Sequence, residues 1–201
     1  EIKNRITAVK STQKITKAMK MISATKLKRA QDRIIATRPY AYKMAELLSH
    51  LTAASEDISS PLMQEREMKK RLVVIVSGDR GMCGSFNSNL IKYASNYIDE
   101  IGKDTQVLTV GKKGNDYFSK RKYNVIKSYT QLFSNLNLGI SNEIANYIVT
   151  GYLNGDFDLV EILLQYFTRF LSNKLMACTV ESIFTNAVLL IILIWDGVHE
   201  C

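Results

Sequence analysis

The chain has 201 residues, of which 46% are hydrophobic and 23% charged, proportions that are ordinary for a globular protein. Its longest apolar run, residues 187–195, is too short to cross a membrane as a helix, and residues 1–20 lack the apolar core of a signal peptide. The three widely spaced cysteines, Cys83, Cys178 and Cys201, form neither a disulfide framework nor a metal-ligand pattern, so we expect a soluble protein in a reducing, intracellular compartment.

The net charge of +8 is concentrated at the N-terminus. Residues 1–38 contain eleven Lys and Arg side chains but only two acidic ones, Glu1 and Asp32. Because so few i,i+4 ion pairs can form, the cations of this segment repel one another. The pattern therefore predicts an acidic partner, which could be a protein surface, a nucleic acid or an anionic lipid.

Residues 2 to about 55 are predicted to form one long helix, since they contain no glycine and most of their residue types favour helix. Pro39 is expected to kink this helix rather than end it. Apolar residues recur as in a coiled-coil seam, and the seam shifts sideways where the basic residues are densest, at Ile15, Met19 and Ile22. We assign residues 1–55 to a coiled-coil helix that needs at least one partner helix, because its apolar face is too small for stability alone.

Residues 56–70 are polar and charged and are predicted to be a linker. The β-branched run at 71–77 is typical of a strand that is buried on both faces of a parallel sheet. Ser141, with Glu143 nearby, is expected to start the last helix. The alternation of elements predicts a doubly wound, mostly parallel α/β domain over 71–184, with an atypical apolar tail at 185–201. Its predicted strands are 71–77, 106–110, 125–129, 159–167 and 175–184, and its predicted helices are 87–101, 115–120 and 141–153.

A glycine-rich turn, Ser77-Gly-Asp-Arg-Gly-Met-Cys-Gly84, follows the first predicted strand, where α/β proteins often bind nucleotides. Its G-x-x-G-x-x-G spacing differs from the dinucleotide and P-loop fingerprints, and Asp79 would repel a phosphate. We therefore interpret it as a structural turn, and a nucleotide-dependent enzyme is a less favoured alternative. The residues assigned to this structural role are Asp79, Arg80, Gly81, Cys83 and Gly84.

The sequence predicts no catalytic site, cofactor or metal. Cys83 would need a neighbouring base to act as a nucleophile, but both histidines, His50 and His199, lie far from it in the sequence. A buried and unreactive Cys83 is the favoured interpretation. The carboxylates are scattered, with no paired acid and base.

A basic nucleic-acid-binding protein is the main alternative, because basic-region DNA readers also use continuous helices that lead into a zipper. The side chains that usually read bases do not gather on one face of this helix. An appended α/β domain would also be unusual in that class.

Four segments closely resemble the gamma subunit of F-type ATP synthase, and the likeness extends to about Phe170. They are residues 2–6 (IKNRI), 14–21 (KITKAMKM), 26–31 (KLKRAQ) and 79–84 (DRGMCG), the last followed by Phe86 and Asn87. The resemblance implies a non-catalytic rotor subunit, whose N-terminal helix pairs antiparallel with a C-terminal helix to form a shaft. That shaft would couple proton-driven rotation to ATP synthesis in the alpha–beta hexamer.

The same resemblance implies the partners: the alpha and beta subunits of the hexamer, the epsilon subunit and the membrane c-ring. It implies no nucleic acid, no cofactor and no direct small-molecule substrate. Lys14, Lys17, Met19 and Lys20 would face acidic segments of the beta subunits. The implied location is peripheral, on the cytoplasmic face of the bacterial plasma membrane or, alternatively, on the matrix side of the mitochondrial inner membrane.

Two features depart from the family pattern. Gly78 stands where the family has Ser or Thr, which leaves the turn plausible. The tail after residue 185 is unlike the family, so we expect the partner helix to be missing from this chain. A chloroplast-type cysteine insertion is absent as well, so thiol regulation is not expected.

Overall fold

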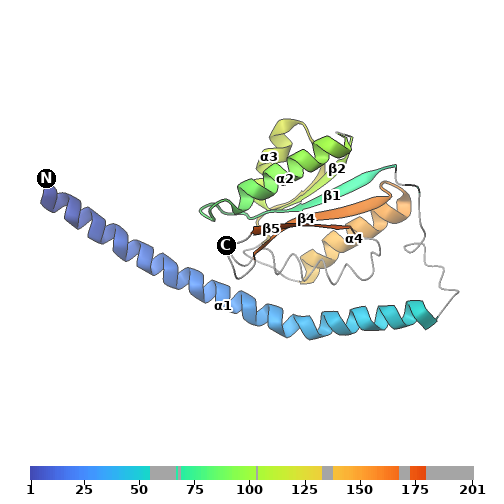
Figure 1. Cartoon of the computed structure of the whole chain (residues 1–201), viewed down its shortest axis with the longest axis horizontal. Helices are drawn as coiled ribbons and strands as arrows, with labels where there is room; N and C mark the ends of the chain where they lie inside the picture. The colour runs from blue at the N-terminus through green and yellow to red at the C-terminus, as the bar shows by residue number, and fades with distance from the viewer. Residues whose placement is uncertain (55–66, 68, 103, 133–137, 168–172, 180–201) are drawn as a thin grey trace.

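The computed structural model describes residues 1–54, 67, 69–102, 104–132, 138–167 and 173–179. A long N-terminal helix lies outside an α/β unit that is built on a five-stranded sheet (Figure 1). Almost all of the predicted linker, the last residues of the predicted α/β domain and the predicted tail at 185–201 lie outside the described residues.

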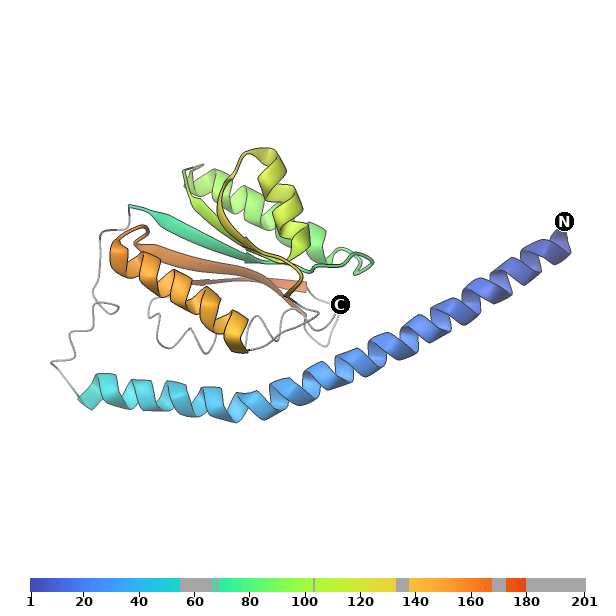
Figure 2. The ribbon, with the colours of Figure 1, turned by 180° about the vertical axis from the view of Figure 1, so that it is seen from behind.

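The N-terminal helix, α1, runs from Ile2 to Ala54 and continues through Pro39. Its 53 residues correspond to a length of about 80 Å at 1.5 Å per residue. Seen from behind in Figure 2, its axis changes direction between the N-terminal and C-terminal portions. A proline inside a helix removes one backbone hydrogen bond and is a common cause of such a bend.

The strand order of the sheet is β3-β2-β1-β4-β5. β1, β2, β3 and β4 are parallel to one another, and β5 pairs antiparallel with β4. This arrangement confirms the predicted doubly wound, mostly parallel class. The strands are β1 (Arg71–Val76), β2 (Gln106–Val110), β3 (Asn124–Tyr129), β4 (Leu159–Phe167) and β5 (Asn173–Thr179).

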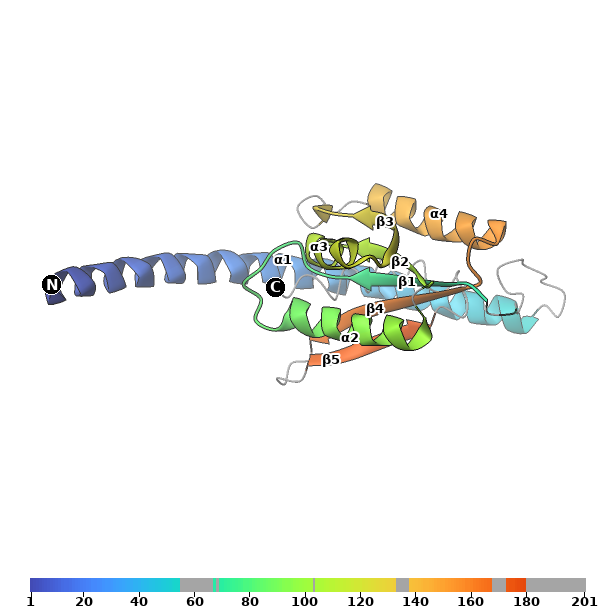
Figure 3. The same ribbon diagram turned by 90° about the horizontal axis from the view of Figure 1, so that it is seen from above.

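Helices cover both faces of the sheet, as Figure 3 shows from above. α2 (Phe86–Ile101) and α3 (Lys112–Phe118), with the short 3₁₀ turn η1 (Ser119–Arg121), lie on one face. α4 (Leu138–Asn154) lies on the other. The expected start of this last helix at Ser141 is wrong, because the helix begins three residues earlier and the Ser141 side chain is buried within it.

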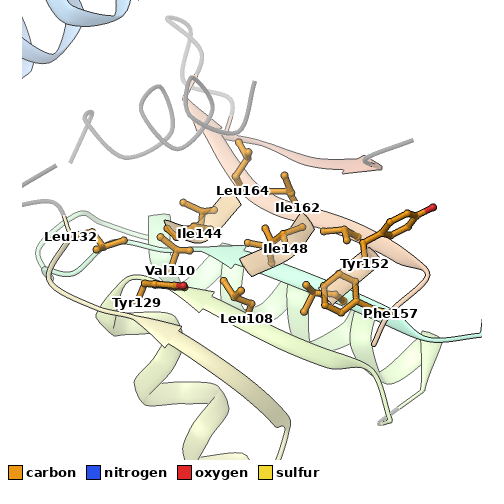
Figure 4. Packing of buried hydrophobic residues seen from close by; sticks show 14 residues of the cluster. Leu108, Val110, Tyr129, Leu132, Ile144, Ile148, Tyr152, Phe157, Ile162 and Leu164 are labelled. Carbon is orange, nitrogen blue, oxygen red and sulfur yellow. The ribbon is translucent and has the colours of Figure 1, made fainter. Parts of the chain in front are cut away.

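Two apolar layers form the core, one on each side of the sheet. Successive β1 residues point alternately to the two layers, and each residue from Leu72 to Val76 is at most 1% exposed, which explains the uninterrupted apolar run. Toward α4, the side chains of β2 and β4 meet Ile144 and Ile148 (Figure 4). Toward α2, Val73 and Ile75 pack against Leu90 and its neighbours.

Candidate functional site

The exposed N-terminal half of α1 carries the predicted contact residues. Each of residues 1–26 is exposed, including Lys14, Lys17, Met19 and Lys20. A helix turns by about 100° per residue, so residues separated by three, four or seven positions share a face. Four lysines with this spacing form one row, here called the basic stripe: Lys3, Lys10, Lys14 and Lys17.

The helix geometry does not place all four predicted contact residues on one face. Lys14 and Lys17 belong to the basic stripe, and Lys20 borders it one turn beyond Lys17. Met19 is two positions from Lys17 and therefore points to the opposite side. Lys3 and Lys10 were not among the predicted contact residues, although their seven-residue and four-residue spacings to the next lysine are visible in the sequence.

Met19 belongs instead to an exposed apolar row, here called the apolar stripe, with Ile15 and Ile22. Ile15 is 60% exposed, Met19 is 48% exposed and Ile22 is 57% exposed. Apolar residues in a row of this kind normally pack against another surface. The two stripes on opposite sides of one helix therefore suit two different partners, one acidic and one apolar.

The glycine-rich turn lies at the carboxyl edge of the sheet, and Asp79 ties three loops together there. Its Oδ1 accepts hydrogen bonds from the backbone N–H of Lys112 at 2.8 Å and of Gln131 at 3.1 Å. These two residues follow β2 and β3, whereas Asp79 itself follows β1. The carboxylate is thus engaged with the protein's own backbone.

The side chain of Asn87 holds the turn in shape from the first turn of α2. Its Oδ1 accepts a hydrogen bond from the Gly78 N–H at 2.8 Å, and its Nδ2 donates to the Arg80 carbonyl at 3.2 Å. Nδ2 also lies 3.0 Å from Cys83 Sγ. Sequence reasoning missed this role, because an asparagine at the start of a helix does not reveal which loop it will bind.

Cys83 is half-buried rather than buried as predicted, because it lies in the turn and not in the apolar core. Its sulfur contacts the Asn87 amide and the Arg80 carbonyl, at 3.0 and 3.9 Å. Neither group is a base that could activate the thiol. Arg80 and Gly81 are exposed at the apex of the turn, and Gly84 has a positive φ of 58°.

Ser77 and Gly111 close the space between the ends of β1 and β2. Ser77 Oγ accepts a hydrogen bond from the Gly114 N–H at 2.8 Å, and a Cβ on Gly111 would lie 1.9 Å from the Ser77 carbonyl oxygen. A phosphate-binding loop instead directs free N–H groups at its ligand. This edge instead combines the engaged Asp79 carboxylate with tight backbone packing between the ends of β1 and β2.

The described part of the chain holds no group of three or more His, Cys, Asp or Glu side chains that could bind a metal ion. Among the same residues, no helix combines the length and the apolar character needed to cross a membrane.

A buried carboxylate lies on the α2 face of β4. Glu161 is 6% exposed, and its Oε1 accepts a hydrogen bond from the Tyr97 hydroxyl at 2.6 Å. Arg71 Nη1 lies 3.9 Å from Oε2. Burial, and then the bond to Glu161, raise the pKa of Tyr97 to about 12.

The free energy of unfolding should fall as pH rises above about 10, and we expect Tyr97→Phe to make that fall smaller. Because the pKa of Tyr97 is higher in the folded state than in the unfolded state, its contribution is complete below about pH 10 and is lost as pH rises toward about 12. For this half-buried side chain the contribution is roughly 1 kcal/mol. Urea unfolding between pH 8 and 11 measures it, with Tyr93→Phe as the control. Equal pH slopes for Tyr97→Phe and the unmodified chain would contradict this assignment.

A long exposed helix with two different stripes is attached to an α/β unit, and exposed stripes of this kind are suited to contacts with other surfaces. A family model described as ATP synthase matches residues 1–188. ATP synthase gamma chains from Chlorobium phaeobacteroides and Desulforamulus reducens are 43% and 40% identical over 179 and 174 residues, covering 86% and 87% of this chain. The chain therefore belongs to the ATP synthase gamma chain family.

The chain spans 61% of the length of each of these two relatives. The central stalk and c-ring structure of Tetrahymena thermophila mitochondrial ATP synthase contains a chain with the same fold, with a TM-score of 0.65 and 21% identity. That match covers 92% of each of the two chains.

Proposed function

We propose that this chain is the central-stalk rotor subunit of a proton-translocating F-type ATP synthase and has no catalytic site of its own. It would couple proton-driven rotation to ATP synthesis in the alpha–beta hexamer. One observation carries the proposal, namely that α1 is exposed along residues 1–26 and bears the basic stripe and the apolar stripe on opposite sides.

The two stripes make the helix unequal around its axis, which is the property a rotor needs. The basic stripe would face acidic segments of the beta subunits, whereas the apolar stripe would pack against a partner helix or an apolar lining. As the helix turns, each beta subunit meets a different surface in succession. Differential contacts of this kind shift a subunit between conformations, so rotation drives the catalytic sites in sequence.

The remaining partners are proposed by analogy with the family. The Tetrahymena structure named above contains the central stalk together with the c-ring. By analogy, the α/β unit of this chain would lie near the epsilon subunit and the c-ring. The protein would be peripheral, on the cytoplasmic face of the bacterial plasma membrane or on the matrix side of the mitochondrial inner membrane.

Reversing two charges on α1 tests the proposal. We expect Lys17→Glu with Lys20→Glu to lower coupled ATP synthesis about tenfold in a reconstituted complex, because two attractive contacts become repulsive. Thermal unfolding of the chain should barely change, since both side chains are exposed. The matched control reverses Lys92 and Lys120, which are exposed on the α/β unit. Equal synthesis by the two double variants would contradict a contact surface on α1.

A further inference from the structure

The segment that leads into β1 is held by the turn between α4 and β4. Asp158 Oδ2 accepts hydrogen bonds from the backbone N–H of Lys69 at 3.2 Å and of Lys70 at 3.0 Å. In the opposite direction, the Asp158 N–H donates to the Lys70 carbonyl at 2.8 Å. Lys70 Nζ also donates to the Gly155 carbonyl at 3.1 Å. Four hydrogen bonds thus join this turn to two consecutive residues.

The turn is itself anchored in the core. The Asp156 N–H donates to the Gly151 carbonyl at 2.9 Å, which ties the turn to the end of α4. Gln106 Nε2, at the start of β2, donates to the Asp156 carbonyl at 3.2 Å. Phe157 is 1% exposed, and its ring packs so closely on Gly151 that an added Cβ would lie 2.6 Å away. A force on Lys69 and Lys70 therefore passes into α4, β2 and the apolar core.

Lys69 and Lys70 are the last residues before the central strand of the sheet. The chain from α1 reaches the sheet through the residues just before β1, and β1 lies in the middle of the sheet between β2 and β4. A pull on these residues would act first on the hydrogen bonds at the start of β1. A carboxylate that accepts hydrogen bonds from two consecutive N–H groups opposes separation of this segment from the sheet, because hydrogen bonds to a charged acceptor are stronger than neutral ones.

We propose that Asp158 is a positioning residue that clamps the start of β1 and thereby transmits torque between α1 and the α/β unit. The transmission of torque rests on the proposed rotor function. The clamp itself does not, so each can fail separately.

Hydrogen exchange on the chain alone tests the clamp. We expect Asp158→Ala to speed exchange of the Lys69 and Lys70 amides about tenfold or more, since each loses a charged acceptor. Asp158→Asn keeps an oxygen that can accept these bonds and should restore most of the protection. The control is Asp156→Ala, which removes an exposed carboxylate from the same turn. Unchanged exchange in Asp158→Ala would overturn the clamp, whatever the function of the chain.

Coupling in the reconstituted complex tests the transmission of torque. With Asp158→Ala, we expect ATP hydrolysis to continue while ATP-driven proton pumping per ATP hydrolysed falls, and Asp158→Asn should recover most of the pumping. A merely structural role would lower hydrolysis and pumping together, and that result would overturn the proposal. A coupling ratio equal to that of Asp156→Ala would also overturn it. Failure of the unmodified chain to assemble would reject the rotor function and, with it, the torque role, but would leave the exchange result intact.

Discussion

Gly111→Ala is expected to prevent the α/β unit from folding. Gly111 has a φ of 101°, and a Cβ there would lie 1.9 Å from the Ser77 carbonyl oxygen and 2.8 Å from Ser77 Oγ. The oxygen at 1.9 Å belongs to the backbone, so a side-chain rotation cannot relieve the clash and the ends of β1 and β2 would have to separate. Together with the unfavourable φ, we expect a loss of about 4 kcal/mol or more, a large part of a typical domain's stability.

A second glycine separates the clash from the backbone strain. Gly102 has a φ of 126°, and a Cβ there would meet nothing within 4 Å. Gly102→Ala should therefore cost only about 1 to 2 kcal/mol. Urea unfolding followed by circular dichroism compares the two variants. A Gly111→Ala protein as stable as the Gly102→Ala protein would show that β1 and β2 do not approach as closely as described.

Asp79→Ala is expected to destabilise the chain by about 2 to 4 kcal/mol. The substitution leaves the N–H groups of Lys112 and Gln131 without their carboxylate acceptor, and bonds of this charged type contribute more than neutral ones. The loops after β1, β2 and β3 would then lose their common tie. Asp79→Asn keeps an oxygen in place and should lose less than half as much.

Chemical unfolding of the Asp79 variants checks this expectation, with Asp104→Ala as the control. Asp104 is exposed on the same α/β unit, so its replacement should cost less than about 0.5 kcal/mol. If Asp79→Ala proved as mild as Asp104→Ala, the carboxylate would not be holding the three loops.

The elements that sequence reasoning found most accurately are those whose pattern is local. The bounds predicted for β2 and β4 match the observed strands, because short apolar runs between polar residues define both ends. α1 was equally predictable, since it contains no glycine. Its one proline, Pro39, was expected not to end the helix, and the helix continues through it. The antiparallel direction of β5 was not predictable, because pairing direction depends on the path of the chain between strands.

α3 shows why other bounds could not be predicted. The sequence suggested a helix from 115, but α3 begins at Lys112. Two lysines and a glycine in the first turn disfavour a helix, because cations oppose the helix dipole and glycine is flexible. The start is stabilised by partners more than thirty residues away: Asp79 accepts from the Lys112 N–H, and Ser77 Oγ accepts from the Gly114 N–H. Contacts between residues so far apart in the sequence leave no periodic pattern in it from which the start of the helix could be predicted.

The candidate surface on α1 was identified by its charge alone, although its helical spacing could also have been read from the sequence. The excess of lysine identified the segment, whereas the helix geometry separates Met19 from Lys14 and Lys17 and adds Lys3 and Lys10. The hydrogen bonds of Asn87 and Asp158 were not predictable, because each side chain binds backbone groups that only the fold brings near.

Observation of single complexes tests the central claim most directly. An alpha–beta hexamer assembled with this chain would be fixed to a surface through its beta subunits. A bead would be attached at a cysteine introduced in place of Lys92, which is exposed on α2. On addition of ATP, we predict that the bead rotates in one direction in complexes that hydrolyse ATP. A stationary bead in complexes that still hydrolyse ATP would contradict the rotor function.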